Sequence, residues 1–171
     1  MKRTIFAVID ATRARLFTFD RADEVGGTRE SLVERIDLVN PARRRTTAQL
    51  FSDTRTNTNR TGGRFYGVDD HRNAHIAEID AEFARSVASA IDHMMRDTEA
   101  MRVVVCAPPR MLGMLRTADL QRDGVVIDEL AHDYTKMTAP QIRELLGQHH
   151  LLPASRRRRV ARERAHAHAR R

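Results

Sequence analysis

A run of four apolar residues, Val103–Cys106, constrains the fold of this chain more than any other sequence feature. A strand with apolar side chains on both faces must be covered by protein on both sides, as parallel strands of α/β sheets are. Pro108 and Pro109 end the run, and proline suits the first turn of a following helix. The sequence therefore predicts a buried strand over residues 102–107, followed directly by a helix.

The residues before this strand predict an antiparallel meander and a long helix. Runs of β-branched and aromatic residues over 4–9 and 15–19 are typical of paired strands, and residues 32–39 alternate as a third strand. Apolar residues spaced by three and four over 73–96 predict an amphipathic helix. Alternation places four residues of the third strand on one face: Leu32, Glu34, Ile36 and Leu38.

The remaining elements complete an α/β fold. Residues 125–127 predict another buried strand, and the Thr-x-x-Gln pattern of 138–141 predicts a capping box that begins a last helix. The order β-β-β-α-β-α-β-α predicts a single three-layer domain with a mixed sheet, the ribonuclease H-like arrangement. Nine apolar residues are expected to share one core: Ile5, Val8, Leu16, Ile36, Phe83, Val87, Val104, Leu115 and Ile127.

The charge is concentrated at the C-terminal end. The chain has 30 Lys and Arg against 23 Asp and Glu, a formal charge of +7. Residues 153–171 hold eight arginines and one glutamate, so residues 1–152 are formally neutral. We therefore expect a folded domain over 1–152 and a disordered arginine-rich tail over 153–171, which either attaches to RNA, DNA or an anionic surface or acts as a solubilising extension. Its candidate nucleic-acid-binding residues are Arg156, Arg157, Arg158 and Arg159.

Residues 41–72 form a second basic segment, rich in Thr, Asn, Arg and Gly, with neither a helical nor a strand period. Structureless stretches of this length are uncommon inside compact domains and are usually functional or disordered. The segment is predicted to be a long basic loop that contacts nucleic acid. Its candidate residues are Arg43, Arg44, Arg45, Arg60 and Arg64.

Arg110 follows the buried strand, at a position where open α/β sheets place ligands and where a helix N-terminus favours anions. Two interpretations stay open. Arg110 binds a phosphate or carboxylate of a ligand, or it pairs with a carboxylate of the domain such as Asp133.

The segment Ala107–Arg116, with Asp10 and Ala14–Phe17 upstream and Asp133–Thr135 downstream, resembles the bacterial host attachment protein family. The resemblance extends to 50–53 and 75–85 and covers about residues 4–147. This family is grouped with bacterial relatives of the archaeo-eukaryotic peptide release factor, whose middle domain has a ribonuclease H-like arrangement. The resemblance implies a translation-associated protein that binds RNA or the ribosome.

The release factor acts on peptidyl-tRNA through a Gly-Gly-Gln loop tip that precedes a long helix. In this sequence Gly62 and Gly63 precede Arg64, which stands where the resemblance would require glutamine. These three residues are the candidate catalytic tip, but the substitution removes the basis for expecting peptidyl-tRNA hydrolysis. Whether any reaction is catalysed stays open.

A metal-dependent nuclease is an alternative, because nucleases of this fold bind metal ions through carboxylates. Asp10, Glu78 or Glu82, and Asp128 or Asp133 could supply them. Each also has a structural interpretation: Asp10 caps a turn, and the two glutamates occupy a solvated helix face. We expect no metal site and no cofactor. Cys106, which ends a buried strand, is not expected to be a nucleophile.

The sequence predicts a cytoplasmic protein with no membrane partner. It contains no apolar run near the roughly 18 residues of a membrane span, and its N-terminus lacks the apolar stretch of a signal peptide. A role in attachment to a host or surface, the other alternative, would then be indirect. The oligomeric state is left open.

Overall fold

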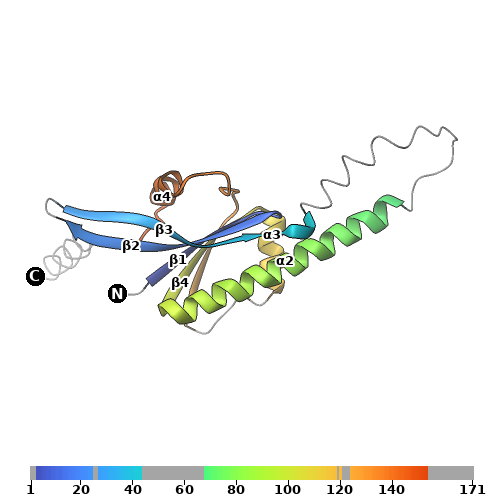
Figure 1. The fold of residues 1–171 in the computed structure, drawn as a ribbon, viewed down its shortest axis with the longest axis horizontal. Helices are drawn as coiled ribbons and strands as arrows, with labels where there is room; N and C mark the ends of the chain where they lie inside the picture. Colours follow the sequence, from blue (N-terminus) through green and yellow to red (C-terminus); the bar gives the residue numbers. More distant parts are fainter. Residues whose placement is uncertain (1–2, 25–26, 44–67, 119, 121–123, 154–171) are drawn as a thin grey trace, which may run out of the picture.

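The computed structural model describes residues 3–24, 27–43, 68–118, 120 and 124–153. The predicted order of strands and helices is confirmed (Figure 1). The strands are β1 (Arg3–Ile9), β2 (Arg13–Glu24), β3 (Gly27–Val39), β4 (Ala100–Cys106) and β5 (Val126–Leu130). The helices are α2 (Val68–Thr98), α3 (Pro109–Thr117) and α4 (Ala139–Gln148).

The five strands form one mixed sheet in the order β3-β2-β1-β4-β5. The pairs β1–β2 and β2–β3 are antiparallel, whereas β1–β4 and β4–β5 are parallel. This topology is the α/β, ribonuclease H-like arrangement that the sequence predicts. The carboxyl ends of β1, β4 and β5 consequently lie along one edge of the sheet.

Helices cover both faces of the sheet, so there are two cores rather than the single one predicted. Ile5, Leu16 and Val103 pack under α2 and α3, on one face. Val8 and Val104 pack on the other face, with α4. Figure 1 shows α4 on the opposite side of the sheet from α2 and α3. Since successive side chains of a strand point to opposite faces, neighbours in β1 and β4 must enter different cores.

A β-bulge in β3 corrects a second prediction. Leu16 pairs with Ile36 but Phe17 pairs with Glu34, so Arg35 is an extra residue in the ladder. The alternation therefore changes phase: Leu32 enters the core under α4, while Ile36 packs under α2. The four residues predicted to share one face do not share it.

Some element boundaries and the burial of one strand also differ from the predictions. Residues 68–72, expected in the loop, form the first turns of α2, and residues 41–43 are helical as well. The amino-terminal part of α2 extends beyond the sheet (Figure 1). The strand expected to be buried at 125–127 is the edge strand β5, in which Val126 is 57% exposed.

Candidate nucleic-acid interface

The turn between β1 and β2 is organised by Asp10, which directly follows β1. One carboxylate oxygen of Asp10, Oδ1, accepts hydrogen bonds from the backbone N–H groups of Thr12 (2.6 Å) and Arg13 (2.7 Å) and from the Thr12 hydroxyl (2.7 Å). Aspartate commonly stabilises turns in this way. The predicted turn-capping role of Asp10 is therefore confirmed by its contacts.

Thr135 connects this turn to the segment that follows β5. Its hydroxyl lies 2.8 Å from Oδ2 of Asp10 and 2.6 Å from Oδ1 of Asp133, within hydrogen-bond distance of both. Burial raises the pKa of Asp10, whereas the hydrogen bonds from Thr12, Thr135 and Arg13 lower it. Together the hydrogen bonds have the larger effect, so the pKa is lower than its ordinary value. Asp10 is thus a carboxylate whose acceptor positions are occupied by the protein itself.

Of the other acids considered for metal binding, Asp133 shares the Thr135 hydroxyl with Asp10, and the remaining three lie elsewhere. Glu78 and Glu82 are exposed on α2, and Asp128 pairs with Arg102 at 2.7 Å. In the part of the chain that the structure describes, no group of three or more His, Cys, Asp or Glu residues could hold a metal ion.

Asp80 is a buried acid that the sequence reasoning missed, with only 2% of its surface exposed. Its two carboxylate oxygens accept hydrogen bonds from Nε and Nη2 of Arg43, at 2.7 and 2.9 Å. Nη2 of Arg110 lies 3.7 Å from Oδ2 of Asp80. The intramolecular carboxylate beside Arg110 is therefore Asp80, and the suggested pairing with Asp133 is wrong.

Asn40 joins the end of β3 to the Asp10 turn. Its backbone N–H donates to the carbonyl of Thr12 (2.8 Å), and its side-chain amide donates to the carbonyl of Ala11 (3.0 Å). The Asn40 side-chain oxygen in turn accepts a hydrogen bond from the backbone N–H of Arg43 (3.3 Å). These contacts position Arg43 for its ion pair with Asp80.

Arg85 and Arg110 line a groove of about 250 Å³ between α2 and α3, called here the α2–α3 groove. Its other lining residues are Ala81, Gly113, Met114, Thr117 and Ala118. Arg85 is exposed and forms no ion pair with the residues that the structure describes. The Arg110 side chain is 60% exposed. The groove therefore presents guanidinium groups to solvent.

Most other described arginines are paired closely with carboxylates. Arg13, Arg15 and Arg35 bind Asp37, Glu34 and Asp20 at 2.6–2.9 Å. Arg96 pairs with Asp92 on α2, and Arg116 on α3 pairs with Glu129. The α2–α3 groove differs from these places because Arg85 has no ion pair among the described residues and the ion pair of Arg110 with Asp80 is longer, at 3.7 Å.

A family model matches residues 5–146, and its description is "Protein required for attachment to host cells". The chain belongs to this host-attachment family. The resemblance seen in the sequence is thereby confirmed, whereas the relationship to the peptide release factor stays a prediction. No curated protein shows significant similarity to the chain.

The comparison with solved structures finds matches at low sequence identity and low TM-score. A Ppx/GppA phosphatase of Aquifex aeolicus, a type II variant, is 14% identical over 76% of this chain and 36% of its own, with a TM-score of 0.39. Another Aquifex aeolicus PPX-GPPA structure is 14% identical over 75% of this chain and 36% of its own, with a TM-score of 0.38. RuvC of Thermus thermophilus is 14% identical over 89% of this chain and 83% of its own, with a TM-score of 0.37. The chain thus spans little more than a third of the Ppx/GppA proteins.

Of the predicted site residues, the host-attachment chain brings Arg43 and Arg110 together at Asp80. The others lie outside the described residues: Arg44, Arg45, Arg60, Gly62, Gly63, Arg64, Arg156, Arg157, Arg158 and Arg159.

Two further features of the host-attachment chain bear on function. Cys106 is buried, and burial raises the pKa of its thiol to about 12, which opposes formation of the reactive thiolate. No helix in the described part of the chain is both long and apolar enough to cross a membrane.

Proposed function

We propose that this host-attachment protein binds RNA through its phosphates and that the α2–α3 groove is one of its contact surfaces. The observation that carries the proposal is the pair of exposed arginines, Arg85 and Arg110, on one groove. Guanidinium groups suit this role because their planar N–H donors match phosphate oxygens and their charge persists at every physiological pH.

The electrostatics of the groove favour an anionic partner. Neutralising phosphates with arginine releases condensed counterions, so affinity falls steeply as salt rises. An arginine already paired with a carboxylate gains less from a phosphate, because it must give up its partner. Arg85 has no such partner among the described residues, and Arg110 has one at 3.7 Å only.

The arginines of residues 44–67 and 154–171 add to the positive charge of the chain. The chain enters the first of these segments immediately after Arg43 and leaves it at the start of α2, the helix that carries Arg85. A ribosome is the kind of RNA target we propose, because phosphate contacts position a protein while the shape of the target supplies discrimination. Under this proposal the attachment role named by the family description is indirect.

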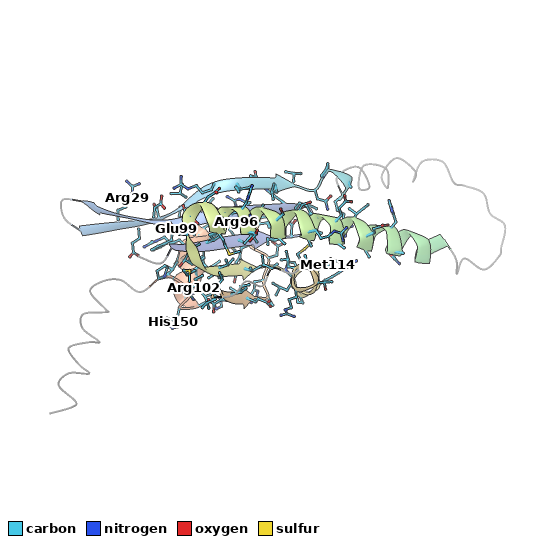
Figure 2. All side chains as sticks on the ribbon, turned by 90° about the horizontal axis from the view of Figure 1, so that it is seen from below. Arg29, Arg96, Glu99, Arg102, Met114 and His150 are labelled. Carbon is cyan, nitrogen blue, oxygen red and sulfur yellow. The ribbon has the colours of Figure 1, made fainter. Side chains whose placement is uncertain are left out.

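Binding of the full chain to labelled single-stranded RNA and co-sedimentation with ribosomes, at low and high salt, test the proposal. Arg85→Gln with Arg110→Gln should weaken RNA binding by roughly 10-fold or more and reduce the salt dependence. The matched control is Arg96→Gln with Arg116→Gln, which removes one exposed, ion-paired arginine from each of the same two helices. Figure 2 shows Arg96 on α2 away from Met114, which is a residue of α3 that lines the groove.

Two results would overturn the proposal. One is that the intact chain binds neither RNA nor ribosomes at low salt. The other is that both double variants bind as tightly as the intact chain, which would show that the groove makes no contact.

A further inference from the structure

We propose that the α2–α3 groove recognises a terminal phosphate monoester, such as the 5′-phosphate of an RNA strand, in preference to the internal phosphodiesters. This inference rests on the proposed function and narrows it to one chemical group. It is carried by the charge balance, the unused donors and the size of the groove.

The two arginines that line the groove together match the charge of a dianion. Asp80 accepts hydrogen bonds from Nε and Nη2 of Arg43, so the charges of these two side chains offset each other. Arg85 and Arg110 then contribute two positive charges that no described carboxylate neutralises at hydrogen-bond distance. A phosphate monoester carries about −1.5 to −2 at neutral pH, whereas an internal phosphodiester carries about −1. The monoester is therefore the better match for the site.

Asp80 orients Arg110 without accepting a hydrogen bond from it. The 3.7 Å separation between its Nη2 and Oδ2 of Asp80 is too long for a hydrogen bond, although the opposite charges still attract. Asp80 is thus a positioning residue: it holds the Arg110 guanidinium near the groove while leaving its N–H donors for a ligand. An incoming phosphate accepts these donors without first breaking a hydrogen bond.

The groove is small, and it has space beside Gly113. A volume of about 250 Å³ lies below the usual range for a whole drug-sized ligand, which fits a phosphate with part of its sugar. Gly113 lines this space, and a Cβ atom built on it would meet no atom within 4 Å. A larger side chain at position 113 can therefore fill the groove while leaving both arginines in place.

The test compares two single-stranded RNAs of identical sequence, one with a 5′-phosphate and one with a 5′-hydroxyl, by equilibrium binding to the full chain. The phosphorylated RNA should bind on the order of 10-fold more tightly. Arg85→Gln with Arg110→Gln, and separately Gly113→Leu, should abolish this difference. Arg96→Gln with Arg116→Gln should preserve it. Circular dichroism confirms that each variant is folded.

AMP and adenosine form a second arm, which distinguishes a free monoester from an RNA end. If AMP binds in a groove-dependent manner and adenosine does not, the monoester inference stands even where RNA binding fails. If both RNAs bind equally and the arginine variant weakens both, the groove contacts the RNA backbone; the inference is then overturned while the proposed function stands. The absence of any effect of the 5′-phosphate together with no binding of AMP also overturns it.

Discussion

The negative charges of Asp10 and Asp80 are compensated by different means. Asp80 is almost fully buried and is compensated by the charge of Arg43. Asp10 is compensated by hydrogen bonds from the backbone and from hydroxyl groups. A carboxylate that is wholly or partly removed from water requires one or other form of compensation, because an unpaired charge is costly there. The two residues should therefore respond differently to substitution.

The contribution of Asp10 to stability should depend on pH. Its pKa is lower in the folded protein than its ordinary value of 3.8, so the folded state binds its proton less readily than the unfolded state. The stabilisation is therefore fully present above about pH 5 and is lost as the pH falls through the lowered pKa. The free energy of unfolding of the native chain should exceed that of Asp10→Asn by a constant amount at neutral pH. Urea titrations should show that this gap narrows in acid; a gap independent of pH would contradict the prediction.

Asp80→Asn should destabilise the domain at neutral pH. The substitution removes the charge that balances Arg43, whose side chain is largely buried, and breaking such pairs typically costs about 3 kcal/mol. Urea unfolding measures the loss. Glu78→Gln, on the exposed side of the same helix, is the control and should change the free energy of unfolding by less than about 0.5 kcal/mol. Equal effects of the two substitutions would contradict the burial argument.

At the scale of elements, the sequence predicted the strands and helices well because their apolar periods are local. Residues 103–106 required a covered strand, and the strand is buried on both faces. The bulge at Arg35 was not predictable in this way, since it depends on how β3 pairs with β2 rather than on β3 alone. The edge position of β5 likewise depends on what lies beside the strand.

The site was only partly predictable for the same reason. Asp80 carries a local signal, because it lies four residues after Ile76 and three before Phe83 and so falls on the apolar stripe of α2. An acid at such a position indicates a buried ion pair. Its partner Arg43 lies 37 residues away along the chain, and no local pattern connects the two.

Gly113 and Gly124 provide a prediction about helices and turns. Gly113 lies inside α3 with open space beside it, so Gly113→Ala should stabilise the protein by about 0.5–1 kcal/mol. Gly124 has a φ of +80°, a conformation that alanine adopts poorly, so Gly124→Ala should be destabilising. Thermal unfolding of both variants checks the opposite signs; a lower melting temperature for Gly113→Ala would contradict the prediction.

For the whole molecule, the formal charge arises from the C-terminal residues. Deletion of residues 154–171 should weaken binding to any RNA and flatten the dependence on salt, because those arginines neutralise phosphates regardless of sequence. Salt titrations of RNA binding by the intact and shortened chains measure both effects. The preference for a 5′-phosphate should survive the deletion, since the α2–α3 groove is unchanged. A loss of that preference would place the recognition in the tail.

The position of residues 44–67 in the topology has a consequence for how the chain can be divided. The three strands before this segment form one half of the sheet, and β4 and β5 after it form the rest, so the halves meet at the parallel pair β1–β4. Each half alone would expose an apolar face and an unpaired strand edge. Two separately expressed fragments, 1–43 and 68–171, should therefore reassemble by complementation, held at the seam by β1–β4 pairing and by the contact between Arg43 and Asp80. The native fold can in this sense be regarded as two complementary fragments of one chain that associate as the subunits of a heterodimer do.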